Sequence, residues 1–312
     1  MGRFIIKILA VAAVVGLVFV PVNQFVSVSH DYNINHAILN FKNNPRPVDI
    51  INVGASHSMY GYNFKSTGLE HLDLALPAQT IEYDYKLLKE YGEHLKDDGV
   101  VLVSLSQITF GSTETKFIGN YYEILDREDI DPYNVFDYYS YLYLPGANTA
   151  SFLSAVAGKF KEFRWDDHKP WVDNGDAYAE RKSKRVEAEY AAAVEANTIS
   201  ENMRYLKKII EYCEERDYTV VLTIEPVHES YAAYFSEDDM ERLVFQHLDA
   251  LDFDVPLLDY MNDERFASSR EYFIDGDHLN KTGRKVYSEI VYEDLKEMGY
   301  LHRPESIPVG RK

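Results

Sequence analysis

Two short motifs at opposite ends of the chain hold the side chains that could do chemistry. Ser56 follows Gly54 and an apolar run, and Asp275 and His278 stand three residues apart across a glycine-containing turn. A carboxylate can accept the Nδ1 proton of an imidazole, which leaves Nε2 free to take the proton of a serine hydroxyl. The three residues therefore predict a nucleophilic triad in which Ser56 attacks, His278 is the base and Asp275 orients the base.

The position of Ser56 supports this interpretation. A serine directly after an apolar strand and a glycine sits at the carboxyl edge of a parallel sheet, where open α/β folds bind ligands. Gly54 permits the sharp turn, and the residues after Ser56 can begin a helix whose free N–H groups favour a developing negative charge. A Gly-x-Ser sequence after a strand is more often a simple turn. The prediction that Ser56 is a nucleophile therefore depends on Asp275 and His278. Near these two residues, Asn280 can cap the helix that follows.

Three further interpretations stay open around the two motifs. His228 follows the fourth apolar run and would either line the same cleft or be an ordinary loop residue. His57, beside the nucleophile, could orient a substrate or make a structural hydrogen bond. Asp275, Asp277 and His278 could instead ligate a metal, but residues so close in sequence need a further ligand that the pattern does not supply. We therefore expect no metal and no cofactor.

Short apolar runs alternate with helical patterns over most of the chain. The strand-like runs are residues 48–53, 72–76, 99–105, 218–224 and 255–259, and the helical patterns are 79–95, 238–251 and 281–298. Near-continuous apolar strands connected by helices are typical of a parallel sheet that is covered on both faces. The sequence thus predicts a doubly wound, three-layer α/β/α domain with a parallel sheet of about five strands.

A tyrosine-rich stretch interrupts this alternation after the third strand. It carries helical patterns over residues 133–143 and 177–196 and is too long to be a plain loop. We expect a helical insertion at about 108–197 that shapes a substrate cleft, docks a partner or simply packs. The expected organisation is an anchor or signal segment at 1–28, a connector at 29–47, the α/β domain at 48–300 with its insertion, and a tail at 301–312.

The N-terminal segment is directed to a membrane. Arg3 and Lys7 precede an uncharged apolar run over residues 8–22, and a second short apolar piece follows at 25–28. A spanning helix needs about 20 apolar residues, whereas the core of a signal peptide has roughly 7–15. We favour an uncleaved, single-pass anchor at the cell membrane, with the N-terminus cytoplasmic and the bulk of the chain extracytoplasmic. Secretion after cleavage of a signal peptide is the alternative.

The charge balance limits the partners of this chain. The formal net charge of −19 argues against an electrostatic contact with nucleic acid or with an anionic membrane surface, because both need a positive field. Cys213 is the single cysteine in the sequence, so neither an internal disulfide nor a cysteine metal cluster can form.

The two motifs resemble the first and last sequence blocks of a known family. Gly54-Ala55-Ser56-His57 stands where SGNH (GDSL-like) hydrolases and acyltransferases carry their Gly-x-Ser block, and Asp275-x-x-His278-Leu279-Asn280-x-x-Gly283 matches their last block. Within that family the chain is most similar to membrane-anchored envelope proteins that act in teichoic-acid D-alanylation and in alginate acetylation. The resemblance leaves out the insertion. It implies an SGNH, flavodoxin-like fold and acyl chemistry at Ser56.

The middle blocks of the family are degenerate in this chain. Its Asn-x-Gly-x-x-Gly-x-Thr block reads here as residues 73–80 with only Thr80 retained, and its Gly-x-Asn-Asp block reads as residues 104–107 with no asparagine. For the oxyanion we expect the backbone N–H groups of Ser56 and Ala78, with a side chain from Ser106 or Gln107 where the family uses asparagine. Losing one such donor typically costs on the order of 100-fold or more in rate, which would suit slow turnover or a narrow transfer role.

The resemblance and the anchor together imply an extracytoplasmic esterase or O-acyltransferase. Ser56 would take an acyl group from an ester or thioester donor and pass it to water or to a hydroxyl of an envelope glycan, with a membrane-bound acyltransferase as a further partner. The alternative is a catalytically silent scaffold of the same fold that binds a membrane acyltransferase or a glycan. The degenerate middle blocks favour that alternative.

Overall fold

The apolar runs form the strands of one parallel sheet. The computed structural model describes residues 1–29, 31–112, 115, 117–160, 171 and 175–301. Within them the strand order is β2-β1-β3-β4-β5, and every pairing is parallel. The strands are β1 (Val48–Val53), β2 (His71–Asp73), β3 (Leu95–Leu105), β4 (Thr219–Ile224) and β5 (Leu257–Asp259). This arrangement confirms the predicted doubly wound α/β class.

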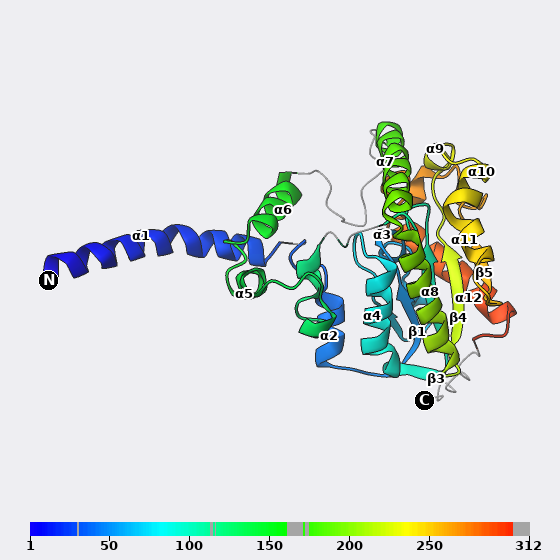
Figure 1. The fold of residues 1–312 in the computed structure, drawn as a ribbon, viewed down its shortest axis with the longest axis horizontal. Helices are drawn as coiled ribbons and strands as arrows, with labels where there is room; N and C mark the ends of the chain where they lie inside the picture. Colours follow the sequence, from blue (N-terminus) through cyan, green and yellow to red (C-terminus); the bar gives the residue numbers. More distant parts are fainter. Residues whose placement is uncertain (30, 113–114, 116, 161–170, 172–174, 302–312) are drawn as a thin grey trace, which may run out of the picture. The chain divides into compact units, whose positions relative to one another are not determined.

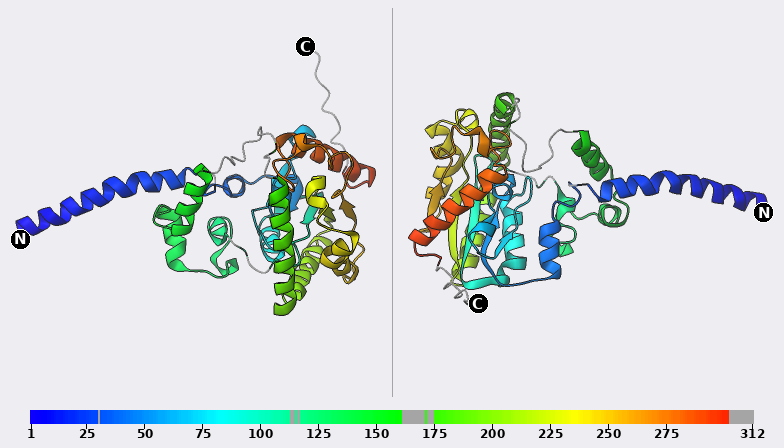
Figure 2. Two further views of the ribbon diagram at one scale, coloured as in Figure 1. Left: turned by 90° about the horizontal axis from the view of Figure 1, so that it is seen from above. Right: turned by 180° about the vertical axis from the view of Figure 1, so that it is seen from behind.

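Helices cover both faces of the sheet (Figures 1 and 2). Helices α4 (Ile81–Tyr91) and α8 (Ile199–Glu214) pack against each other on one face, and α12 (Lys281–Glu297) lies on the other. Because both faces are covered, residues 100–105 of β3 are all buried, and Val101 and Val103 pair with apolar residues on both β1 and β4. On the α12 face an aromatic core that includes Tyr62, Phe266, Phe273 and Tyr287 fills the space below the last helix.

Several element boundaries differ from the sequence-based expectation; for example, β3 begins at Leu95 and not at residue 99. The second strand ends at Asp73 and not at residue 76, because the Asp73 carboxylate accepts hydrogen bonds from Ala75 N and Asn52 Nδ2 and turns the chain out of the sheet. The helix expected over 238–251 is divided into α10 (Glu237–Met240), a π-helical turn η5 (Glu241–Phe245) and α11 (Gln246–Asp249). The other elements around the sheet are α3 (Ser56–Met59), η1 (Phe64–Ser66), η2 (Gly92–His94), α7 (Gly175–Ala196), α9 (Glu229–Ala232) and η6 (Arg270–Tyr272).

The chain forms two compact units. One unit combines residues 1–43 with 117–166, and the other combines 44–116 with 167–312 and contains the sheet. The residues expected as a single insertion at about 108–197 therefore belong to both units. The elements of the first unit are α1 (Gly2–Ser27), α2 (His36–Asn43), η3 (Ile118–Tyr121), η4 (Arg127–Asp129), α5 (Val135–Tyr143) and α6 (Thr149–Phe160).

Helix α1 is long and apolar enough to cross a membrane. It has 26 residues, and none of its most apolar 18-residue window is buried against the rest of the protein. A core helix of a soluble protein would bury those side chains, so α1 is not a core helix. Length and composition alone do not separate a retained anchor from a signal segment.

The turn that carries Asp275 and His278 is held at both ends. Phe273 and Leu279 form an antiparallel bridge across it, and Ile274 N donates to the His278 carbonyl oxygen at 2.8 Å. Asn280 then caps α12 as expected, because its Oδ1 accepts from Thr282 N and Gly283 N at 2.9 and 3.0 Å. Its Nδ2 donates to the carbonyl oxygen of Glu271 at 2.7 Å. One side chain thus joins the turn, the helix and the preceding loop.

Replacement of Asn280 tests this joint role. Asn280→Ala removes the cap and the Nδ2 donation, so we expect a loss of about 1–2 kcal/mol in the free energy of unfolding, measured by urea titration of the full chain in detergent. Asn280→Asp keeps an oxygen that can cap α12 and loses the donation to Glu271, so its loss should be smaller. An alanine variant as stable as the wild type would contradict this role.

Candidate active site

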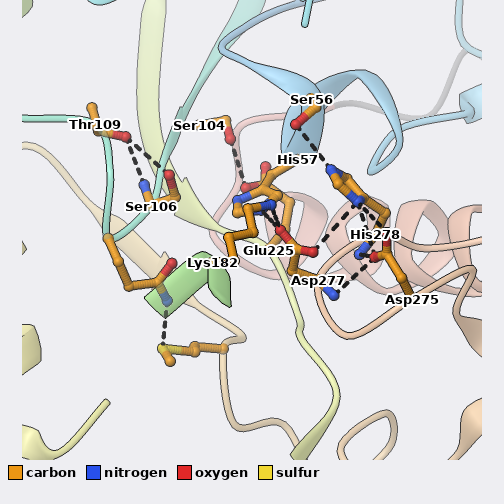
Figure 3. A network of polar contacts seen from close by, with 12 residues as sticks. Ser56, His57, Ser104, Ser106, Thr109, Lys182, Glu225, Asp275, Asp277 and His278 are labelled. Carbon is orange, nitrogen blue, oxygen red and sulfur yellow. Dashed lines mark hydrogen bonds and ion pairs between the residues drawn. The ribbon is translucent and has the colours of Figure 1, made fainter. Parts of the chain in front are cut away.

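The three residues that the sequence predicts as a triad lie in hydrogen-bond contact. Ser56 Oγ is 2.9 Å from His278 Nε2, and His278 Nδ1 is 3.0 and 3.1 Å from the two carboxylate oxygens of Asp275 (Figure 3). Asp275 and His278 are buried, whereas Ser56 is partly exposed. Ser56 is therefore the member of this chain of contacts that a substrate could reach.

Ser56 is placed by the turn that ends β1. Gly54 has φ of +141°, and a Cβ on it would lie 2.7 Å from Ser104 Cβ and 2.9 Å from Ser58 Cβ, so the chain at this point requires glycine. Ser56 then opens the short helix α3. Ser58 is turned inward, where its hydroxyl contacts Asn52 Nδ2 and the Val53 carbonyl oxygen. Of these two serines, only Ser56 has a histidine as its hydrogen-bond partner.

The Asp275 carboxylate is oriented by the backbone of its own turn. Its Oδ1 accepts from Asp277 N at 3.1 Å and from His278 N at 3.0 Å, and the same atom contacts the imidazole. Because an ionised carboxylate only accepts hydrogen bonds, His278 Nδ1 carries the proton in this contact and Nε2 is the basic nitrogen. This is the tautomer that a general base for Ser56 needs.

The charge states of the pair follow from burial and from one nearby cation. Burial lowers the pKa of His278, and the Lys182 ammonium lowers it further against the opposing effect of Asp275. Burial by itself would raise the pKa of Asp275, but His278 and Lys182 together bring that pKa below its ordinary value. Near neutral pH the site therefore holds a neutral imidazole beside a carboxylate.

A second polar cluster, Lys182, His57 and Asp277, lies beside the triad and was not predicted from the sequence as a group. Asp277 is fully buried, forms an ion pair with Lys182 of α7, and accepts from His57 Nε2 at 2.7 Å. His57 thus makes a structural hydrogen bond, one of the two roles that the sequence left open. Burial, with Lys182 next in importance, holds the pKa of His57 well below its ordinary value. Lys182 falls within the helical pattern predicted over residues 177–196, and no local signal singled it out.

Two residues of this cluster, together with His278, are the set of side chains among the described residues that could hold a metal ion. Ligand atoms of His57, Asp277 and His278 lie within 4.8 Å of one another, so His57 takes the place of the Asp275 expected from sequence. The Lys182 ammonium is already on Asp277, and His278 Nε2 already contacts Ser56. A cation at this point would have to displace Lys182, so the donor set suits an internal ion pair better than a metal.

The residues expected to bind the oxyanion divide into two kinds. The backbone N–H groups of Ser56 and Ala78 donate no hydrogen bond to the described residues, and Ala78 has φ of +53° at the turn that precedes α4. Ser106 instead hydrogen-bonds Thr109 through both its N–H and its hydroxyl, and Gln107 Nε2 contacts Met261 Sδ at 3.1 Å. Two backbone donors are thus available, and the two side chains are directed to structural partners.

His228 supports the site and does not contact the triad through its side chain. The ring Nδ1 accepts from Ser230 N at 3.1 Å and caps α9, and the ring packs between Trp171 and Phe273. Its backbone N–H donates to the Gly276 carbonyl oxygen at 2.9 Å. His228 therefore holds the turn that carries Asp275, and this structure gives it a positioning contact where the sequence left cleft lining open.

A buried carboxyl, Glu225, lies at the end of β4 behind these residues. It accepts from Ser104 Oγ at 2.6 Å and from Thr223 Oγ1 at 3.2 Å, and it is 4% exposed. Burial raises the pKa of Glu225 to about 7, with the hydrogen bonds from Ser104, Tyr62 and Thr223 opposing the shift. The sequence raised His228 as a residue that could line the cleft, but it gave no sign that nearby Glu225 would be enclosed.

The similarity that the comparisons found between this chain and known proteins lies in structure. No protein-family model and no curated protein matches the chain. Among solved structures, a Bacteroides fragilis protein described as a candidate acylhydrolase is similar over 86% of this chain and 97% of its own, at 12% identity and a TM-score of 0.41. A likeness at that level is limited to general architecture and says nothing about activity.

The raised pKa of Glu225 predicts a pH dependence of stability. Between the ordinary carboxyl value of 4.5 and about 7, the folded protein binds more protons at Glu225 than the unfolded chain does, so its contribution to stability falls as pH rises through this window. Glu225→Gln keeps hydrogen-bonding atoms and removes the titration. Relative to the wild type, we expect the variant to gain about 2 kcal/mol of stability between pH 5 and pH 8.

Urea unfolding of both proteins at the two pH values measures this gain. Glu128→Gln, at an exposed position in η4, is the control and should follow the wild-type curve at both values. Parallel pH profiles for the wild type and Glu225→Gln would contradict the prediction.

Proposed function

We propose that this protein is an extracytoplasmic SGNH-type esterase or O-acyltransferase that acts on cell-envelope polysaccharide or glycopolymer. The observation that carries the proposal is the unbroken contact chain from a partly exposed Ser56 through His278 to Asp275. The resemblance of the two motifs to SGNH blocks supports the reaction class. The apolar helix α1 supports a location at a membrane.

In the proposed reaction Ser56 Oγ attacks the carbonyl carbon of an ester or thioester while its proton passes to His278 Nε2. Asp275 stabilises the imidazolium that forms, and the backbone N–H groups of Ser56 and Ala78 would face the negative oxygen. The bond to the leaving group breaks as Nε2 returns the proton to that group. An acceptor hydroxyl, from a glycan or from water, then attacks the acyl carbon as its proton passes to Nε2. The bond between Ser56 Oγ and the acyl group breaks, and Nε2 returns the proton to Oγ, which regenerates Ser56.

The two outcomes of this reaction differ only in the acceptor. Transfer to a sugar hydroxyl needs a site that admits the glycan and excludes water. Helix α7 brings Lys182 onto the cluster beside the triad, so this part of the expected insertion contributes to the site. That contribution supports a restricted acceptor and keeps transfer alongside hydrolysis in the proposal.

Covalent labelling tests the nucleophile. A fluorophosphonate probe should label the wild-type chain at Ser56, and Ser56→Ala should abolish labelling. His278→Gln should slow labelling by roughly 10⁴-fold, because it removes the base. Ser58→Ala is the matched control and should still be labelled, since Ser58 contacts Asn52 and a backbone carbonyl. Equal labelling of the wild type and Ser56→Ala would exclude Ser56 as the nucleophile.

A second candidate function is a silent scaffold that binds a membrane acyltransferase or a glycan. One observation favours it: Ser106 and Gln107, which replace the asparagine-bearing block of the family, are directed to Thr109 and Met261. The same labelling experiment separates the two functions, because a scaffold without a reactive serine remains unlabelled under conditions that label the enzyme.

Lys182 gives a second prediction about this chemistry. Burial lowers the pKa of His278, Asp275 opposes this, and Lys182 adds to the lowering, so Lys182→Met should raise that pKa. The pH below which labelling slows should then move to a higher value, because more of the His278 imidazole is protonated at a given pH. Lys184→Met changes an exposed lysine on the same helix and should leave that pH unchanged. A value that is identical in all three proteins would show that Lys182 does not act on His278.

A further inference from the structure

Helix α5 and the turn into α6 expose large apolar side chains. Val135, Phe136, Tyr139 and Tyr143 of α5 are 47, 83, 47 and 68% exposed, and their spacing places them along one side of the helix. We call these four residues, together with Leu144 of the turn and Leu153 of α6, the α5–α6 apolar surface; the last two are 48 and 59% exposed. Exposed apolar side chains gathered in this way mark a contact surface.

The segment that carries most of this surface is unlike the rest of the chain in charge. Residues 138–158 contain no Asp, Glu, Lys or Arg, in a protein whose charged residues make up 27% of the sequence and whose net charge is −19. Six acidic residues lie directly before it, between residues 123 and 137. An acidic protein is repelled by anionic surfaces, so an uncharged segment is the part that can approach a membrane without that penalty.

Residues 138–158 contact the C-terminal part of α1 and the residues that follow it. Gly146 N donates to Asn23 Oδ1 at 3.0 Å, and a Cβ on Gly146 would lie 2.7 Å from Asn23 Cα, so the two backbones touch. The rings of Tyr32 and Tyr141 are 4.8 Å apart, and the Tyr32 hydroxyl donates to the Tyr141 carbonyl oxygen at 2.8 Å. The Ser154 hydroxyl also donates to Asp31. Helices α5 and α6 are thus held at a fixed level along α1.

The position of Asn23 along α1 gives the depth of this contact relative to a bilayer that α1 spans. A helix rises about 1.5 Å per residue, so about 20 residues cross the roughly 30 Å hydrocarbon core. Counted from Lys7, the last charged residue before the uncharged stretch, the far edge of the core falls near Ser27. Asn23 lies four residues, or about 6 Å, before that edge. The turn at Gly146 therefore sits at the boundary between acyl chains and headgroups.

We propose that the α5–α6 apolar surface lies in the membrane interface around the C-terminal end of α1 and contacts lipid. Tyrosine and phenylalanine rings are suited to this zone, because they combine an apolar body with a polar or polarisable edge that tolerates the headgroup region. The occupant is the bilayer and not a partner protein, since the contacts to Asn23 and Tyr32 set the depth of the surface without any other chain. The consequence is a second point of contact with the membrane beside α1. This inference does not depend on the proposed reaction.

Depth-dependent fluorescence of the full chain in phosphatidylcholine nanodiscs tests the proposal. Phe136→Cys, Tyr143→Cys and Leu153→Cys, each combined with Cys213→Ala, would carry a nitrobenzoxadiazole label. Glu128→Cys, at an exposed position of η4 in the same unit, is the matched control. We expect doxyl-labelled lipid to quench the first three labels roughly twofold or more above the control. Quenching equal to the control at all three positions would overturn the proposal.

A second measurement uses the unmodified chain and so is independent of any effect of labelling on folding. Phosphatidylcholine with a diazirine on its acyl chain is incorporated in the same nanodiscs and photoactivated, and the modified peptides are mapped by mass spectrometry. Modification of peptides that cover residues 135–153, in addition to α1, is the expected result. Modification confined to α1 would overturn the proposal, and it is also the result expected if the surface were reserved for a protein partner.

Discussion

The site depends on one buried pair, His278 and Asp275, held on a tight turn at the carboxyl edge of the sheet. Burying an imidazole and a carboxyl is unfavourable unless each finds a partner of matching charge or hydrogen-bonding capacity. Here the carboxylate meets two backbone N–H groups and the ring, and the ring meets Ser56 on its other side. This turn is kept closed by the bridge between Phe273 and Leu279 and by the Asn280 cap. The contacts that hold His278 and Asp275 in place therefore also stabilise the start of the last helix.

Around this pair the protein balances charge locally, although its overall charge is strongly negative. Lys182, which is partly buried, supplies a cation to Asp277, and His57 supplies a neutral donor to the same carboxylate. As a result, the His278 imidazole is neutral near pH 7, and the Asp275 carboxylate still orients it. A more basic imidazole would be protonated at neutral pH and could not accept the Ser56 proton. The cluster of Lys182, His57 and Asp277 thus influences His278 and Asp275 electrostatically, through the Lys182 ammonium.

The two units of the chain differ in where their charged and apolar residues lie. The unit that contains the sheet carries the polar site and nearly all of the charged helices. The other unit combines the apolar helix α1 with residues 138–158, which contain no charged side chain. A surface that meets water gains from ionised side chains, whereas one that meets lipid does not. An enzyme on envelope polymers would need both properties in one chain.

Much of this protein could be read from sequence because the deciding interactions are local. Near-continuous apolar runs determined the parallel sheet, an 18-residue apolar window determined the possible membrane helix, and Asp275 and His278 met because a three-residue turn brings them together. Only the tertiary structure decided that Lys182 reaches Asp277, that His57 bonds a residue 220 positions away, and that Ser106 and Gln107 turn to other partners. The same holds for the division of the expected insertion between two units. Such pairings join distant parts of the chain, and their geometry is fixed by how whole elements pack, which no short stretch of sequence contains.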